Sequence, residues 1–217
     1  VLLSPAGDVY GSFTYLALNV VGPNNGGALK RLDVRRAIAL AVDKAACVQL
    51  FGGPRVARAL YQAVPSSTAG FRRGADRDVT PGDRGNPAAA RALLAQAGYP
   101  NGIKLRLAYP NIPSGVTIAQ TLQVSLKRAG IDVRLVPSLL SDLYGRLLSN
   151  PENARRGEWD MALAGWAPDW YGDNNGRAVI APLFDGRQFG PNSMDYGGYL
   201  NRDVSSAIDR AITAPSA

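Results

Sequence analysis

The segment KLRLAYPNIPSGVTIAQTLQVSLKRAGIDVRLV, residues 104–136, decides the fold class. Residues 104–109 alternate apolar and polar side chains, which is typical of a β-strand with one buried face. Residues 116–129 carry apolar side chains at helical spacing, Gly130 ends that helix, and residues 131–136 read as a second strand. A strand, a helix and a strand in this length predict a right-handed parallel βαβ unit, and therefore an α/β protein.

Further elements are expected on both sides of this unit. The periodicity and the turn signals predict strands over 13–21, 57–65 and 158–166, and helices over 34–51, 87–97, 139–148, 178–184 and 202–213. Asp33 is expected to cap the first of these helices, because its carboxylate can accept hydrogen bonds from the free amide groups of the first turn. Asn86 followed by Pro87 is the same kind of start signal for the next helix.

The composition excludes several kinds of site. The chain has no histidine, so it contains neither a Ser/His/Asp or Cys/His catalytic centre nor a histidine metal site. Its one cysteine, Cys47, can form no internal disulfide and no thiolate metal cluster. Because Cys47 falls among alanines and valines of a predicted helix, we expect a buried and unreactive thiol. We expect no bound cofactor or metal.

The net charge of +7 does not indicate a nucleic-acid partner. The arginines are scattered, and no run of five or more basic residues provides a patch that could follow a phosphate backbone. No apolar run approaches the ~20 residues that cross a bilayer, and the first residues lack the pattern of a secretory signal. Any targeting segment is therefore expected to lie outside this sequence.

The candidate site is MALAGWAPDWYGD, residues 161–173. An apolar run that resembles a buried strand leads into a turn that carries Trp166, Asp169 and Trp170. A strand end is held rigidly while the loop after it is open to a ligand. A carboxylate beside aromatic faces favours a cation. These residues alone support two interpretations, a cation-binding corner or a core tryptophan followed by an ordinary surface turn.

Five segments, in this order, resemble the family 5 extracellular solute-binding proteins of ABC transporters, which include dipeptide- and oligopeptide-binding proteins. They are YLALN at 15–19, LDVRRAIALAVDK at 32–44, ARALLAQAGYPNG at 90–102, AQTLQVSLKRAGIDV at 119–133 and WDMALAGWAPDW at 159–170. The resemblance implies a periplasmic-binding-protein-like type II lobe, with a mixed sheet flanked by helices. Because such proteins have two lobes and are much longer, residues 1–217 are expected to be most of the second ligand-binding lobe. The first lobe, the export signal, the lipoprotein cysteine and the C-terminal helices are expected to be absent.

The resemblance also assigns roles to residues. In members that bind peptides, an aspartate shortly after the Gly-Trp pair forms an ion pair with the free α-amino group of the ligand, and Asp169 matches it. Trp166 and Trp170 would be aromatic walls. Asp173 is a further candidate contact for a cation, although its asparagine and glycine neighbours favour a turn. Arg177 is the candidate partner of a ligand carboxylate, since no basic residue stands just before the Gly-Trp pair.

The implied protein is not an enzyme. It captures a small solute, expected to be a di- or oligopeptide, outside the cytoplasmic membrane and hands it to ABC permease subunits. Membrane association would depend on a lipid anchor outside this sequence. Two alternatives are a solute-sensing domain of a bacterial transcription regulator and a hydrolase that uses Asp169 and Asp173. Relatives bind peptides, metal chelates, haem or sugars, so the sequence does not fix the ligand, and we expect weak binding by an isolated lobe.

Overall fold

The computed structural model describes residues 2–5, 12–66, 68–167 and 176–213. Within this part of the chain the strands form one six-stranded mixed sheet of order β3-β1-β2-β6-β4-β5. The strands are β1 (Leu2–Pro5), β2 (Phe13–Leu18), β3 (Ala57–Leu60), β4 (Ile103–Pro110), β5 (Ile131–Ser138) and β6 (Met161–Trp166). The α/β class and the mixed sheet flanked by helices are therefore confirmed.

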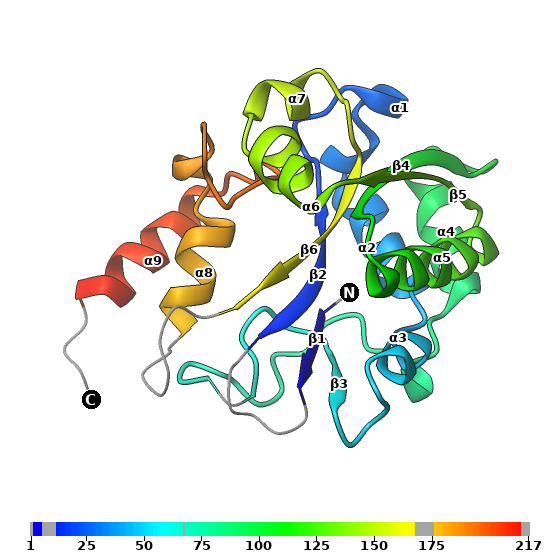
Figure 1. Ribbon diagram of the computed structural model, residues 1–217, viewed down its shortest axis with the longest axis horizontal. Coiled ribbons are helices and arrows are strands. Elements are labelled where there is room, and N and C mark those ends of the chain that lie inside the picture. Colours follow the sequence, from blue (N-terminus) through cyan, green and yellow to red (C-terminus); the bar gives the residue numbers. More distant parts are fainter. Residues whose placement is uncertain (1, 6–11, 67, 168–175, 214–217) are drawn as a thin grey trace.

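Helices cover both faces of the sheet (Figure 1). One side holds η1 (Ala28–Lys30), α2 (Leu32–Ala41), α3 (Lys44–Leu50), α4 (Pro87–Gln96) and α5 (Pro113–Arg128). The short α1 (Asn24–Gly27) leads into η1, and η2 (Pro81–Asp83) contacts α3. The other elements are α6 (Leu140–Asp142), the π-helical turn η3 (Leu143–Leu148), α7 (Pro151–Arg155), α8 (Gly176–Phe184), η4 (Gly186–Gln188) and α9 (Arg202–Thr213). Two apolar cores result: α2 to α5 form the first with one face of the sheet, and η3, α7 and α8 form the second with the opposite face.

The βαβ unit has the arrangement that the sequence predicts. β4 and β5 pair in parallel from Ile103 opposite Ile131 to Pro110 opposite Ser138, and α5 buries its apolar face against the first core. The turns before these strands pack backbone against backbone: a Cβ on Gly102, where φ is +81°, would lie 2.1 Å from the carbonyl oxygen of Gly130. Only glycine fits at residue 102.

β6 lies in the centre of the sheet and pairs in parallel with β4 and antiparallel with β2. Met161 and Leu163 point into the first core, while Ala162, Ala164 and Trp166 lie on the second. Because both faces are covered, this strand reads as a nearly continuous apolar run rather than an alternating one.

A buried asparagine joins the end of β2 to the start of β6. The Asn19 side-chain amide donates to the carbonyls of Ala154 and Trp159 at 2.8 and 2.9 Å, and its oxygen accepts from the N–H of Gly22 at 2.9 Å. β2 ends at Leu18, three residues before the end of the predicted strand. The Asn19 side chain accepts from the backbone just after it, and such local hydrogen bonds compete with the pairing of a strand.

The single helix predicted over 34–51 is wrong. The chain forms α2 and α3, because Val42 is extended (ψ 127°) and the Asp43 carboxylate caps α3 by accepting from the N–H of Ala46 at 2.9 Å. Asp33 is not the N-cap either, since Arg31 holds that position and Asp33 lies in the first turn. Asn86 does cap α4, accepting from the N–H of Ala89 at 3.0 Å.

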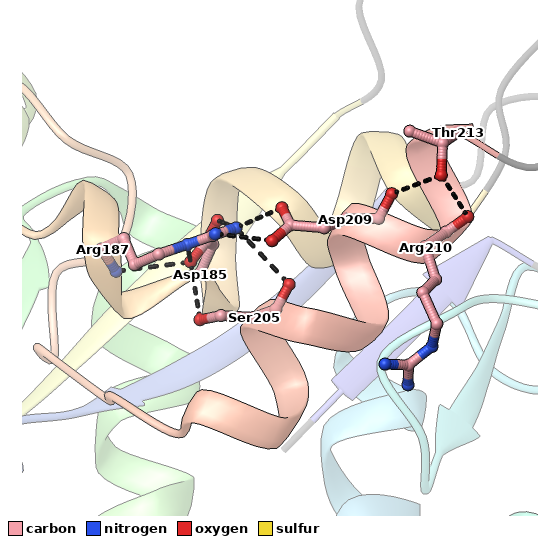
Figure 2. A network of polar contacts seen from close by, with 6 residues as sticks. All are labelled: Asp185, Arg187, Ser205, Asp209, Arg210 and Thr213. Carbon is pink, nitrogen blue, oxygen red and sulfur yellow. Dashed lines mark hydrogen bonds and ion pairs between the residues drawn. The ribbon is translucent and has the colours of Figure 1, made fainter.

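A polar cluster fixes α9 to the segment after α8 (Figure 2). The Arg187 guanidinium donates to both oxygens of Asp185, at 2.8 and 2.7 Å, and to both oxygens of Asp209, at 2.8 Å. Ser205 also donates to Asp185, at 2.9 Å. The hydrogen bond from Arg187 is the main reason that the pKa of Asp185 falls to about 2.

Candidate ligand-binding site

The carboxyl ends of β4 and β6 mark a switch point in the sheet. After β4 the chain enters α5, which packs on the first core, whereas the helix that follows β6 in the described chain, α8, packs on the second. The described helices that follow the two strands therefore pack on opposite faces of the sheet, which is the arrangement that creates a crevice outside the carboxyl ends of the strands in open α/β sheets. In open α/β sheets this is where ligands bind.

The last residues of β6 form one wall of this edge. Trp166 stands opposite Phe13 in the antiparallel ladder with β2, so the amino end of β2 and the carboxyl end of β6 meet there. Trp166 is half-buried and packs against the second core, while Gly165 beside it is exposed. The indole Nε1 of Trp166 is enclosed and has no hydrogen-bond partner in the described part of the chain.

Tyr144, from η3, holds the backbone at this point. Its hydroxyl accepts a hydrogen bond from the N–H of Gly165 at 3.1 Å. Its ring packs against Tyr196 with the ring centroids 6.2 Å apart. Nothing in the sequence pattern singled out Tyr144, since it falls inside a predicted helix and contacts a residue 21 positions later.

Apolar side chains stand exposed along the same edge. Ile112 follows β4, and Leu139 and Leu140 follow β5; they are 41%, 64% and 50% exposed. Asn111 donates from its N–H to the carbonyl of Ser138 at 2.8 Å, which holds these two chain segments together. Exposed apolar groups gathered at a strand edge favour a surface that a ligand or another protein part covers.

A cavity of about 930 Å³, lined by both polar and apolar groups, begins at this edge and runs along η3 and α7. Its lining includes Leu139 as well as Asn111, Ser138, Arg146 and Glu158, and it does not include Trp166. We centre the candidate site on the end of β6, where Trp166 stands opposite Phe13, and Leu139 belongs both to this edge and to the cavity.

Of the predicted site residues, Asp169, Trp170 and Asp173 lie outside the described residues. Trp166 lies at the carboxyl edge as the strand prediction requires. Arg177 lies exposed in the first turn of α8, which is the first described helix after that stretch. The roles assigned to these five residues stay predictions.

Two further expectations concern sites and membranes. Cys47 is fully buried, so the predicted burial of this thiol is confirmed, and burial raises its pKa to about 11, which favours the unreactive thiol form. Within the described ranges, no group of three acidic, cysteine or histidine side chains could hold a metal ion. The helices described for this chain include none with the length and apolar character to span a bilayer.

Solved structures of longer proteins share this fold. Over 96% of the chain, the clavulanic acid biosynthesis oligopeptide binding protein 2 superposes with a TM-score of 0.82 at 23% identity, and HbpA2 from Haemophilus parasuis with 0.78 at 21%. DppA from Helicobacter pylori, solved in complex with the peptide STSA, has a TM-score of 0.75 and 20% identity over 99% of the chain. The chain spans 37% of the first of these proteins and 38% of each of the others.

Sequence comparisons agree with the fold. Di/tripeptide-binding protein 4 of Pseudomonas aeruginosa (strain UCBPP-PA14) is 37% identical over 89 residues, which are 39% of this chain and 15% of that protein. The description "Bacterial extracellular solute-binding proteins, family 5 Middle" belongs to the family model that matches residues 3–181. That match covers most of the sequence, and the chain therefore belongs to the family 5 bacterial extracellular solute-binding proteins.

Proposed function

We propose that this chain is a ligand-binding lobe of the substrate-binding component of an ABC importer for short peptides. The observation that carries the proposal is the position of Gly165 and Trp166 at the carboxyl end of β6, next to the switch point of the sheet. The segment proposed to anchor the ligand would thus begin at the edge where open α/β sheets bind ligands. The names of a curated relative and of one solved structure, a di/tripeptide-binding protein and a complex with the peptide STSA, support the choice of ligand.

The peptide would be held by its ends and its backbone. Asp169, three residues after Trp166, would pair with the free α-amino group, with Trp166 and Trp170 as the walls beside it. An ammonium held by a carboxylate against an aromatic face gains a charge-assisted hydrogen bond and a cation–π attraction. Asp173 is a second candidate for a cation and Arg177 for the ligand carboxylate.

Closure of a second lobe over this edge would complete the site. Ile112, Leu139 and Leu140 expose apolar surface along the crevice, and water would leave that surface when the lobes close. Binding stabilises the closed form because only that form contacts the ligand on both sides, and the closed form would then dock on the permease. The protein would act outside the cytoplasmic membrane, attached through a lipid anchor, and catalyse no reaction.

Calorimetry on a chain that carries both lobes tests this function. A tripeptide with a free amino terminus should bind, and the Asp169→Ala variant should bind it at least about tenfold more weakly, the scale of one hydrogen bond to a charged group. Asp132→Ala is the matched control, because Asp132 is an exposed aspartate on β5 with a 56% exposed side chain. N-acetylation of the peptide should reduce affinity in the same way. Equal affinity for the free and the acetylated peptide contradicts the proposal.

A further inference from the structure

The two central strands β4 and β6 separate at the carboxyl edge of the sheet. The last pair that joins them is Ala108 opposite Ala162. Beyond it, β4 continues to Pro110 along β5, while β6 continues to Trp166 along β2. The backbone groups that face β4 from the last residues of β6 are therefore not paired with that strand.

The N–H of Gly165 is one of these groups. In an antiparallel ladder, residues that bond to the partner strand alternate with residues whose backbone groups point the other way. The N–H of Asn19 donates to the carbonyl of Asp160 at 2.9 Å, just before the ladder of β2 and β6 begins. This bond makes the even-numbered residues of β6 those that face β2, so Gly165 faces the side from which β4 has departed.

The hydroxyl of Tyr144 occupies that position. It accepts from the N–H of Gly165 at 3.1 Å, and the bond lies where solvent reaches it. The ring behind the hydroxyl rests against the ring of Tyr196, with the centroids 6.2 Å apart and the planes inclined by 51°. Tyr144 therefore presents a fixed polar group at the accessible edge of the proposed peptide site.

This hydroxyl has a donor that the fold does not use. A tyrosine hydroxyl can accept a hydrogen bond and donate one. The bond from Gly165 uses it as an acceptor, and in the described part of the chain its own hydrogen has no acceptor. An exposed donor bonds to water in solution, so the hydrogen is available to a ligand that displaces the water. The bond accepted from Gly165 also polarises the hydroxyl and strengthens its donation.

The ligand group that matches is a carbonyl oxygen. A peptide offers carbonyl oxygens as acceptors along its backbone. Asp169, the proposed partner of the α-amino group, follows Gly165 by four residues. In any peptide, the acceptor nearest to the α-amino group is the carbonyl of the first residue. That carbonyl is therefore the one best placed for a donor beside Gly165.

We propose that the Tyr144 hydroxyl donates a hydrogen bond to the carbonyl oxygen of the first residue of the bound peptide. The inference rests on the proposed function and narrows its ligand class. The lobe recognises an ammonium group together with the carbonyl beside it, which is an α-aminoacyl group and not a simple amine. The same hydroxyl oxygen continues to hold Gly165 while its hydrogen binds the ligand.

Calorimetry on a chain that carries both lobes tests this with two probes. One is trialanine, and the other is trialanine with a trans-alkene of the same shape in place of the first amide bond, which keeps the free amino group and lacks the carbonyl. Tyr144→Phe should weaken the binding of trialanine about threefold or more beyond its effect on the alkene, the scale of one neutral hydrogen bond. The alkene also lacks the amide N–H, but this loss is common to both proteins and cancels.

Two results overturn the proposal. Tyr144→Phe may not weaken both probes by the same factor, because a hydroxyl that only positions β6 has that effect. Trialanine binding that is unchanged in Tyr144→Phe is equally incompatible with a direct contact. Failure of the proposed function differs from both, since wild type then binds trialanine no better than its N-acetylated form, and the inference falls with it.

Tyr196→Phe is the matched control. Its ring lies against that of Tyr144, but its hydroxyl donates to Sδ of Met194 at 3.3 Å. Tyr196→Phe should therefore leave the affinity for both probes unchanged. Thermal unfolding of wild type and both variants separates a change in the site from a folding defect, and Tyr144→Phe should remain folded because water can replace the acceptor of the exposed Gly165.

Discussion

The hydroxyl of Tyr144 accepts a hydrogen bond from the backbone N–H of Gly165 at 3.1 Å, joining the turn η3 to the last residues of β6. This contact holds the strand end from which the proposed peptide anchor departs. The ring of Tyr144 also packs against the ring of Tyr196, and this contact restricts the position of the Tyr144 hydroxyl. The position of Trp166 therefore depends on Tyr144, which lies outside the candidate segment 161–173 in sequence and contacts it through Gly165.

Replacement of Tyr144 by phenylalanine should weaken peptide binding more than it weakens the fold. Gly165 is exposed, so water can replace the lost acceptor, and we expect a loss of about 1 kcal/mol or less in the free energy of unfolding. Peptide affinity in a two-lobed chain should fall severalfold, because the strand end moves. Tyr99→Phe is the matched control, since the Tyr99 hydroxyl donates to the carbonyl of Asn25 on another part of the surface. Unchanged peptide affinity in Tyr144→Phe would show that the Tyr144 hydroxyl does not position the end of β6 for binding.

Asn19 should be one of the residues on which stability depends most. Asn19→Ala leaves the buried carbonyls of Ala154 and Trp159 without their donor, and the N–H of Gly22 without its acceptor. We expect the free energy of unfolding in urea to fall by about 2–4 kcal/mol. Asn101→Ala, at an exposed turn position, should change it by less than about 0.5 kcal/mol. A similar effect for both variants would contradict the role given to Asn19.

The parts of the fold that the sequence predicts are those set by local chemistry. β4, α5 and β5 follow from periodicity and from Gly130, and α4 follows from Asn86 before Pro87. The break between α2 and α3 could not be predicted in this way, because Ala41, Val42 and Ala45 continue a helical apolar spacing across it. There the side chain of Asp43 caps a new helix, and a burial pattern carries no sign of that choice.

The candidate site also has parts that local sequence patterns predict and parts that they do not. The strand that ends at Trp166 was predicted, because its apolar run is local. Tyr144 was not, since the group that it contacts, the N–H of Gly165, lies 21 positions later in the sequence. Contacts of this range depend on how η3 and the segment 194–199 pack on the sheet, which no single-segment pattern encodes.

The thiol of Cys47 should be inert in the folded protein. It is fully buried in α3, and burial raises its pKa to about 11, so almost no thiolate is present at pH 8. A disulfide reagent such as Ellman's reagent should therefore release no thiol signal from the native chain at that pH. One equivalent should react once the chain is unfolded in urea. Rapid reaction of the native chain would show that this helix opens easily.

Arg187 should stabilise the packing of α9 against the segment that follows α8. Arg187→Ala removes the cation shared by Asp185 and Asp209, so amide hydrogen exchange within residues 202–213 should become faster. Arg210→Ala is the control: it is the same change within α9, and Figure 2 shows the Arg210 guanidinium pointing away from the cluster. Because the pKa of Asp185 is lowered to about 2, the stability it contributes is present above about pH 4 and lost as the pH falls towards 2. Exchange that is equally slow in both variants would exclude this role.

Asp195 should give stability a pH dependence of the opposite sign. Its pKa is raised to about 6 in the folded chain, against about 4 when unfolded, so between these values the folded state binds more protons. Stability therefore falls as the pH rises from 4 to 6, because the carboxyl must ionise in a buried place. Asp195→Asn carries no such charge, so relative to wild type it should gain on the order of 2 kcal/mol in free energy of unfolding between pH 4 and pH 7. Urea unfolding of both chains across this range measures the difference. A difference that stays constant with pH would mean that Asp195 ionises as freely in the folded chain as in the unfolded one.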